Sequence, residues 1–281
     1  MTIDKIHKIA AFSHNNIGGN PAGVVLTEKM LQEKEMLSVA NKTGYSETAF
    51  LHPENDGWRI RYFSPEIEVD FCGHATIATG AVLGKRFGEG VYKLFLNNGA
   101  ISLTVSESAG HDLTISLQSP ETWSKPAPLA VVNEVLDLFN LKRSFLNTDF
   151  PVRYAFAGAK HLILVLKNRE ILANMNYEFE KTKTLMLQEG LITISLLWQG
   201  SANVFYSRNA FAAGGVYEDP ATGAAAAALA GYLRDINWAG GNKFEIIQGE
   251  DMKVPSHISV EFTPIVGASV KISGKTREIS E

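Results

Sequence analysis

The 281-residue chain is predicted to have a strand-rich α+β fold made of two similar halves. Short runs of β-branched and aromatic residues, separated by Gly, Asn, Pro or Asp, outnumber the helical patterns and are typical of strands. Two helical segments, 74–86 and 221–234, are made mostly of small and apolar residues, and similar residues precede both. The length also favours two domains, since about 150 residues per domain is usual.

The expected strands and helices follow from these patterns along the chain. The clearest strand patterns lie at 6–12, 22–26, 48–52, 58–63, 101–106 and 112–117. The helical patterns lie at 30–41, 74–86, 130–139, 180–189 and 221–234. Between apolar stretches, Asn98-Gly99 predicts a hairpin turn.

The segment 118–128 is the expected boundary between the halves. It reads QSPETWSKPAP, with three prolines in nine residues and no apolar periodicity, which is typical of an exposed connector. We therefore expect an N-terminal lobe over 1–118, a linker over 119–128 and a C-terminal lobe over 129–281. The last strand is free in this scheme to cross back to the first lobe.

A weak internal repeat supports two related halves. The first half has Arg61, Phe63 and Asp70 before its small-residue helix, and the second has Arg208, Phe211 and Asp219 before its own. Chance is the alternative, because small-residue helices are common. Neither helix has a polar face, so both must be buried, and a sheet curled around a central helix would achieve this.

The starts of these two helices are candidate anion-binding sites. The pair Asp219-Pro220 predicts a helix start with an aspartate cap, and the other helix starts after Asp70-Phe71-Cys72-Gly73. A helix start offers free N–H groups and a partial positive charge, which suit a carboxylate or phosphate. The simpler alternative is that Asp219 only caps a buried helix.

Composition and motifs exclude several classes of protein. The net charge of −4 and the pI near 6.0 argue against nucleic acid or an anionic membrane as a partner. The single cysteine, Cys72, excludes an internal disulfide and a metal site with two thiolates. The sequence lacks G-x-G-x-x-G after a strand and H-E-x-x-H, so neither a cofactor nor a metal is predicted. It also lacks G-x-S-x-G, the motif of a serine nucleophile. It also lacks a signal peptide or a spanning apolar run, which predicts a cytoplasmic protein.

Acid–base chemistry remains, and Glu47 and His74 are its candidates. Glu47 follows Ser46 and leads into a predicted strand, where an acidic residue is unusual. Half buried, it could take up and release a proton; the alternative is a solvent-facing edge residue. His74 lies in the first turn of a helix, whose dipole favours the neutral imidazole. The alternative for His74 is a hydrogen-bonded, partly buried histidine without catalytic role.

Six blocks, in order over nearly the whole chain, resemble the PhzF-like (phenazine biosynthesis-like) family of the diaminopimelate epimerase-like superfamily. The blocks are Gly18-Gly-Asn-Pro-Ala-Gly23, Tyr45-Ser-Glu-Thr-Ala-Phe50, Phe71-Cys-Gly-His-Ala-Thr76, Gly158-Ala-Lys-His161, Glu218-Asp-Pro-Ala-Thr-Gly223 and Gln248-Gly249. Each block alone is weakly specific, whereas six in order are strongly specific.

The resemblance implies two similar lobes, each a curved, mostly antiparallel sheet around a central helix, with the active site in the cleft between them. It also implies cofactor-free proton transfer at carbon, with Glu47 as general base and acid. His74 and Asp219 then line the substrate site. Candidates for substrate binding or proton relay are Ser46, Asp70, Gly73, Thr222 and Gly223. Two-lobed enzymes of this kind are often homodimers, so a homodimer is expected.

Two departures from the relatives narrow the chemistry. Amino-acid epimerases of the superfamily use two cysteines, and with Cys72 alone a two-thiol racemisation is excluded. Cys72 is therefore expected to be a small buried residue. In the phenazine enzyme itself a serine stands at the position of Ala224, and the loss of this hydroxyl argues against the same substrate.

The sequence therefore predicts an isomerase that moves a proton between carbons of a small anionic metabolite. One alternative is a one-carboxylate racemase or epimerase of an amino or hydroxy acid. An alternative of another class is a non-catalytic protein that binds a small molecule in the same cleft.

Overall fold

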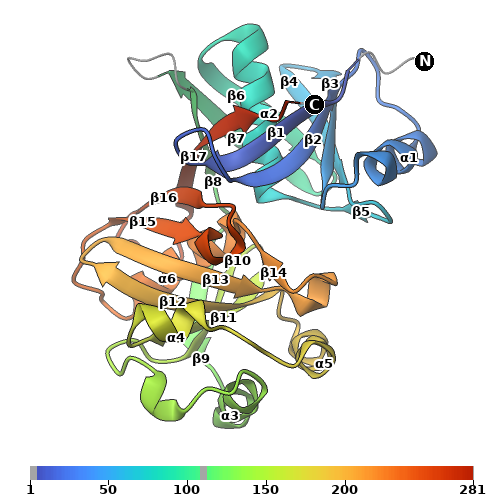
Figure 1. Cartoon of the computed structure of the whole chain (residues 1–281). Coiled ribbons are helices and arrows are strands. Elements are labelled where there is room, and N and C mark those ends of the chain that lie inside the picture. Colours follow the sequence, from blue (N-terminus) through green and yellow to red (C-terminus); the bar gives the residue numbers. More distant parts are fainter. Residues whose placement is uncertain (1–4, 108–112, 281) are drawn as a thin grey trace. The chain divides into compact units, whose positions relative to one another are not determined.

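The computed structural model describes residues 5–107 and 113–280, and its chain forms two compact units (Figure 1). Unit 1 contains Met1–Gln118 and Ser273–Glu281, and unit 2 contains Ser119–Ile272. The C-terminal residues thus return to the unit in which the chain begins. Within the described residues, no helix has both the length and the apolar character needed to cross a membrane.

Unit 1 is a sheet of mainly antiparallel strands with two helices. Its strands are β1 (His7–Ser13), β2 (Asn20–Leu26), β3 (Thr48–Glu54), β4 (Gly57–Phe63), β5 (Glu68–Val69), β6 (Gly90–Leu96), β7 (Gly99–Glu107), β8 (Leu113–Gln118) and the end of β17 (Val270–Glu278). Its helices are α1 (Glu33–Thr43) and α2 (Gly73–Phe87). The pairs β2–β3 and β4–β6 are parallel, whereas β17–β1, β1–β2, β3–β4, β4–β5, β6–β7 and β7–β8 are antiparallel.

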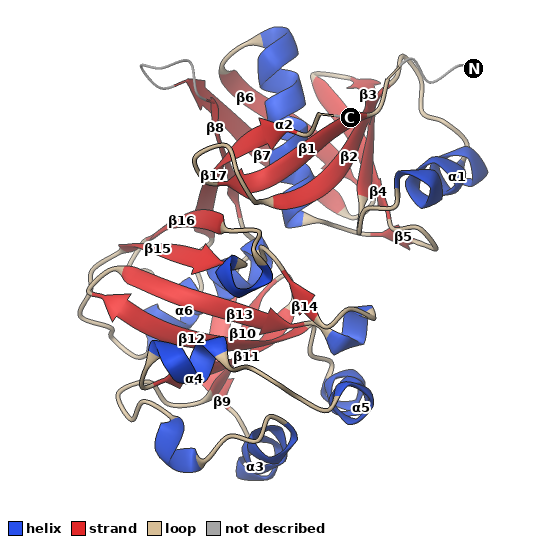
Figure 2. Cartoon of the chain, in the orientation of Figure 1, coloured by secondary structure: helices blue, strands red, loops and turns tan. Residues whose placement is uncertain are grey.

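Helix α2 is enclosed by the strands of unit 1 (Figure 2). It contacts β1, β2, β3, β7 and β8, and all of its residues from His74 to Gly84 are buried. Small residues make this enclosure possible. A Cβ atom on Gly80 would lie 2.5 Å from Ile115 Cγ2, and one on Gly84 would lie 2.7 Å from Val105 Cγ1. The sheet therefore approaches the helix too closely for any larger side chain at these positions.

Unit 2 has its own sheet and its own enclosed helix. Its strands are β9 (Thr122–Pro126), β10 (Arg153–Ala157), β11 (Lys160–Leu166), β12 (Thr193–Ser201), β13 (Val204–Ala210), β14 (Glu218–Asp219), β15 (Lys243–Gln248) and β16 (Ser256–Phe262). Its helices are α3 (Leu129–Leu138), α4 (Arg169–Ala173), α5 (Phe179–Glu189) and α6 (Gly223–Asp235), with short 3₁₀ turns at Arg143–Phe145, Ala212–Gly214 and Glu250–Met252. Helix α6 contacts β9, β10, β11 and β16.

The order of strand pairings in unit 2 repeats that of unit 1. The antiparallel pairs β10–β11, β12–β13, β13–β14 and β15–β16 correspond to β1–β2, β3–β4, β4–β5 and β6–β7 of unit 1. The parallel pairs β11–β12 and β13–β15 correspond to β2–β3 and β4–β6. Helices α2 and α6 each follow the short strand of this series. The registers therefore assign equivalent positions in the two units.

Several expectations from the sequence can be compared with these elements. The predicted hairpin is present, since β6 and β7 pair antiparallel, but Leu96 lies opposite Gly99, so the turn residues are Asn97 and Asn98 and Gly99 is the first residue of β7. The segment expected as a linker, 119–128, contains β9, which pairs with β10. Its prolines flank the strand or end it, and Trp123 stacks on Phe156 with centroids 5.2 Å apart. Asp112, expected to begin a strand, lies outside the described residues.

His161, in the Gly158–His161 block, lies inside unit 2 without exposure to solvent. Its Nδ1 is 2.8 Å from Thr193 Oγ1, and its Nε2 has no hydrogen-bond partner among the described residues. Burial lowers the pKa of His161 from 6.5 to about 3. The imidazole is therefore neutral in the folded protein at pH values well above 3.

We predict that this histidine makes the folded state less stable in mild acid. Between pH 6.5 and 3 the unfolded chain binds a proton at His161 that the folded chain does not. Stability is therefore lost as pH falls below 6.5, by up to about 1.4 kcal/mol per pH unit. Between pH 7 and pH 5 the wild type should lose about 2 kcal/mol more than His161→Gln, which keeps a polar group near Thr193. Urea unfolding followed by tryptophan fluorescence measures this difference, and equal pH slopes for the two proteins would contradict it.

Candidate active site

Glu47 is positioned by the turn between α1 and the strand β3. Helix α1 ends at Gly44, whose φ of 71° is in the left-handed region that glycine adopts without strain. Three residues later, the Glu47 carbonyl accepts a hydrogen bond from the Gly23 N–H at 3.2 Å, next to the parallel pair of β2 and β3. The backbone of Glu47 is thus fixed while its side chain, 19% exposed, extends toward the start of α2.

Cys72 and His74 lie at the first turn of α2. The helix begins at Gly73, and Cys72 is its N-cap residue. The Cys72 carbonyl accepts hydrogen bonds from the N–H and the hydroxyl of Thr76, at 3.0 and 2.7 Å. The Thr76 hydroxyl is also 2.7 Å from the hydroxyl of the buried Tyr62. These contacts fix the backbone from which both side chains project.

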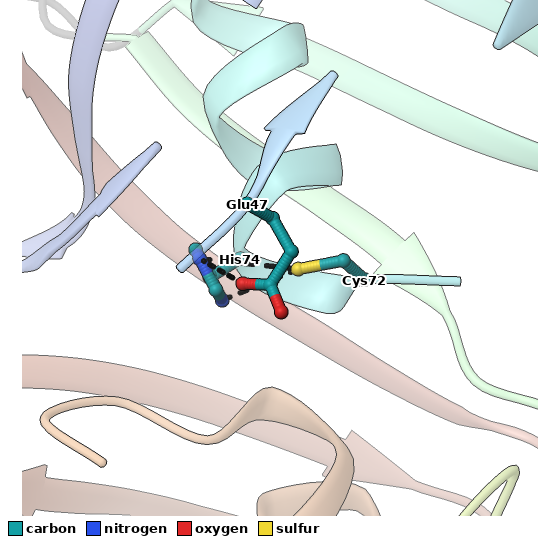
Figure 3. A group of neighbouring side chains, drawn as sticks. All are labelled: Glu47, Cys72 and His74. Carbon is teal, nitrogen blue, oxygen red and sulfur yellow. Dashed lines mark hydrogen bonds and ion pairs between the residues drawn. The ribbon is translucent and has the colours of Figure 1, made fainter. Parts of the chain in front are cut away.

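Glu47, Cys72 and His74 point toward one another (Figure 3). His74 Nε2 is 3.3 Å from Glu47 Oε2 and 3.3 Å from Ser46 Oγ. Cys72 Sγ is 3.3 Å from His74 Nδ1 and 3.9 Å from Nε2. His74 and Cys72 are only 9% and 8% exposed. The structure therefore brings together the two predicted acid–base candidates, one predicted neighbour and the single cysteine.

The carboxylate of Glu47 has an unusual environment. Its Oε2 atom is buried and accepts no hydrogen bond from the described residues, although His74 Nε2 lies 3.3 Å away. A buried carboxylate oxygen without hydrogen bonds is costly and is therefore rare in folded proteins. It retains a free lone pair beside an imidazole, which is the arrangement a proton acceptor needs.

The start of α6 in unit 2 is organised by Gln248. Its Nε2 donates to the Asp219 carbonyl at 2.7 Å and to Thr222 Oγ1 at 3.0 Å. Its Oε1 accepts from Thr222 N–H and from Asn209 Nδ2, both at 3.2 Å. Thr222 Oγ1 also lies 2.5 Å from Asp219 Oδ2. Asp219 and Thr222, two of the predicted site residues, are therefore held in one network by a buried glutamine.

The prediction that Asp219 caps α6 is wrong. Asp219 is paired with Asn209 in strand β14, so its backbone is extended; the N-cap is Thr222, three residues later, and the helix begins at Gly223. The carboxylate of Asp219 instead accepts a hydrogen bond from the hydroxyl of the N-cap residue, Thr222.

The registers also correct the internal repeat. Glu68 lies opposite Phe63, as Glu218 lies opposite Ala210, so the repeated acidic residues are Glu68 and Glu218 rather than Asp70 and Asp219. Each pairs with the repeated arginine. Arg61 and Glu68 form a two-bonded ion pair at 2.7 and 2.5 Å, and Arg208 donates to Glu218 at 3.0 and 2.5 Å.

These ion pairs hold the short strand that precedes each helix. The Arg61 hydrogen bonds keep the pKa of Glu68 below its usual value. Burial alone would lower the pKa of Arg208, but the hydrogen bonds and charge of Glu218 raise it. The sequence alone assigns no role to Arg208, Glu218 or Gln248. What marks them in the sequence is their position: Arg208 lies in the internal repeat, and Glu218 and Gln248 lie in the blocks that match the family.

The other predicted site residues are placed as follows. Gly73 opens α2, and a Cβ added to it would meet no atom within 4 Å, so the space above this turn is open. Gly223 and Ala224 open α6. Asp70 is exposed, and its carboxylate has no hydrogen bond or ion pair within the described residues. The structure does not bring Asp70 to the group around Glu47.

Comparisons with known proteins agree with this fold. An uncharacterized isomerase of Deinococcus radiodurans is 30% identical over 263 residues, which are 90% of this chain and 85% of the relative. The uncharacterized isomerase YfhB of Bacillus subtilis is 27% identical over 277 residues, or 96% of this chain and 94% of the relative. The crystal structure of a PhzF-family phenazine biosynthesis protein from Bacillus anthracis superposes with a TM-score of 0.87 at 24% identity, covering 98% of this chain and 96% of that one.

More distant structures share the fold alone. A probable proline racemase of Agrobacterium radiobacter gives a TM-score of 0.62 at 12% identity, covering 98% of this chain and 90% of that one. A methylitaconate-delta-isomerase gives 0.54 at 10% identity, covering 98% and 93%.

The fold and the relatives together define the class: the protein is an enzyme of the isomerase type. The profile of the phenazine biosynthesis-like proteins, PhzC-PhzF, matches residues 9–281. The chain belongs to this family, as its six sequence blocks predicted.

We predict that Gln248→Met destabilises unit 2, because it leaves the Asp219 carbonyl, the Thr222 N–H and the Asn209 amide without their partner. Unsatisfied buried polar groups cost about 1–3 kcal/mol. Gln199→Met, at a half-exposed glutamine of β12, is the matched control and should change stability by less than about 0.5 kcal/mol. Equal urea midpoints for the two variants would show that the network around Gln248 does not stabilise the start of α6.

Proposed function

We propose that the protein is a cofactor-independent isomerase that moves a proton between carbons of a small anionic metabolite, with Glu47 as general base and acid. The observation that carries this proposal is the buried Glu47 Oε2, which has no hydrogen bond among the described residues and lies 3.3 Å from His74 Nε2. In the first step a substrate C–H bond breaks, its electrons delocalise into the substrate, and the proton goes to Glu47. In the second step Glu47 returns the proton to another carbon.

An anionic substrate suits the start of α2. The first N–H groups of a helix lack partners within the helix, and the dipole adds a partial positive charge there. The open space at Gly73 leaves room for a ligand beside Glu47 and His74. Fixed donors at this position would also stabilise the negative charge that develops when the C–H bond breaks. Asp219, Thr222 and Gly223 at the start of α6 are proposed as further substrate-binding residues.

His74 is proposed to orient Glu47 and to relay protons. Its Nε2 is within reach of both Glu47 Oε2 and Ser46 Oγ, so one imidazole connects two oxygen atoms. A positioned acid–base group of this kind supplies roughly 10²–10⁴ in rate.

The comparison of the two units favours proton transfer by one base. Thr48 pairs with Phe63 in unit 1 as Ile194 pairs with Ala210 in unit 2, so Thr193 stands where unit 1 has Glu47. In the same way, Ala224 follows the first helical glycine where unit 1 has His74. Unit 2 thus offers neither a carboxylate nor an imidazole at the equivalent positions. A single base that removes and returns the proton favours migration between carbons over inversion at one carbon.

The cleft between the two halves, the homodimer and the cytoplasmic location remain predictions from the sequence. The racemase or epimerase and the non-catalytic binding protein are outcomes that the following experiment distinguishes.

We predict that Glu47→Gln abolishes solvent exchange at substrate carbon. The purified protein would be incubated with a metabolite extract in heavy water, and deuterium uptake would be followed by mass spectrometry. Glu47→Gln keeps the size of the side chain but removes the base, so labelling should fall by at least about 100-fold. Glu66→Gln, an exposed glutamate of unit 1, is the matched control and should label normally.

Each outcome decides between the hypotheses. Near-normal labelling by Glu47→Gln would refute the role of Glu47. A labelled product with inverted configuration at the same carbon would identify an epimerase. If no metabolite is labelled above the variant, including with added small carboxylic acids, the protein is better described as a binding protein.

A further inference from the structure

Three different kinds of metal ligand converge at the start of α2. They are the thiol of Cys72, the imidazole of His74 and the carboxylate of Glu47, and one ligand atom from each lies within 4.8 Å of the others. The residues come from two places in the chain, the entry to β3 and the first turn of α2 (Figure 3). Because the backbone at both places is fixed by hydrogen bonds, the group is preorganised.

The distance between His74 Nε2 and Glu47 Oε2 matches the distance between two ligands of a tetrahedral zinc ion. Zinc–nitrogen and zinc–oxygen bonds of about 2.0–2.1 Å place the two atoms about 3.3 Å apart, and a zinc–sulfur bond of about 2.3 Å places sulfur about 3.6 Å from nitrogen. Here His74 Nε2 is 3.3 Å from Glu47 Oε2 and 3.9 Å from Cys72 Sγ. The sulfur lies nearer to Nδ1 of the same ring, at 3.3 Å, so the Cys72 side chain would have to turn toward Nε2 to bind the same ion.

The environment also favours a cation. Glu47 Oε2 is a buried carboxylate oxygen that accepts no hydrogen bond from the described residues, so it has a lone pair directed into the group. Ser46 Oγ, 3.3 Å from His74 Nε2, is the other polar side-chain atom in contact with this nitrogen. A divalent ion would satisfy the carboxylate, and the sulfur of Cys72 is a further ligand of the kind that zinc binds.

We propose that Glu47, Cys72 and His74 form a binding site for Zn²⁺, and that the bound ion blocks proton transfer by Glu47. A thiolate, an imidazole and a carboxylate suit zinc, whereas Mg²⁺ and Ca²⁺ prefer oxygen ligands alone. Three protein ligands leave a fourth position for water. The inhibitory half of this proposal rests on the proposed function, because the lone pair of Glu47 Oε2 would then be used by the metal.

Cobalt provides a direct test, because Cys72 is the only cysteine in the chain. The full-length protein, reduced and freed of metal, would be titrated with Co²⁺ and followed by absorption spectroscopy. We expect a sulfur-to-cobalt charge-transfer band and intense tetrahedral bands that saturate at one ion per chain and disappear when Zn²⁺ is added. Any such charge-transfer band must arise from Cys72.

Variants then test the ligand set. Cys72→Ser should abolish the charge-transfer band. Glu47→Gln and His74→Gln should weaken Co²⁺ binding by at least the roughly 10–100-fold that the loss of an outer-shell partner costs. Asp70→Asn, which removes an exposed carboxylate two residues before Cys72, is the matched control and should bind Co²⁺ as the wild type does. Circular dichroism of each variant shows whether it is folded.

The outcomes separate this proposal from the proposed function. A charge-transfer band that is absent in the folded wild type, or that requires two chains per ion, overturns the metal site, whatever the result of the deuterium assay. For inhibition, deuterium labelling by the wild type is measured with one equivalent of Zn²⁺ and after its removal by a chelator. We expect labelling to stop and then recover; unchanged labelling by zinc-loaded protein overturns the inhibitory role and leaves the binding site in place.

Discussion

The close contact between each central helix and its surrounding sheet is the constraint on which the rest of the structure depends. At Gly80 the side chain of Ile115 occupies the space that a Cβ atom would need, and at Gly84 the side chain of Val105 does the same. Between its ends, each enclosed helix carries no charged side chain, so the charged groups lie at the ends. In unit 1 the start of α2 meets the entry to β3, and Glu47, Cys72 and His74 converge there.

The two units show how one arrangement can serve different purposes. Both have an arginine–glutamate pair that holds the short strand before the helix, and both have a glycine as the first helical residue. In unit 1 the positions around this start carry an ionisable carboxylate and an imidazole. In unit 2 the equivalent positions carry Thr193 and Ala224, and the helix start is stabilised by the amide of Gln248 instead. The scaffold is therefore repeated, whereas the acid–base groups are not.

Much of this could be predicted from local sequence, and the limits have physical causes. The helices 74–86 and 221–234 were predictable because a run of small residues without a polar face has to be buried. The contact of Glu47 with His74 was not, since 27 residues separate them and their approach depends on the parallel pairing of β2 with β3. The same limit explains why Asp219 was taken for a helix cap: Asp-Pro is a strong local signal, but pairing with Asn209 keeps Asp219 in an extended strand. The prolines of 119–128 likewise predicted a connector, although they are compatible with a short strand between them.

Burying a carboxylate oxygen without a hydrogen bond, as at Glu47 Oε2, costs stability. A glutamine at position 47 would reduce this cost, because burying a neutral amide costs less free energy than burying a charged carboxylate. The chain instead keeps Glu47 beside the imidazole of His74 and near the thiol of Cys72. The two roles proposed for this carboxylate, proton transfer and zinc binding, would use the same lone pair of Oε2 and would therefore exclude each other. If Glu47 acts as the base, the same geometry makes the reaction sensitive to zinc.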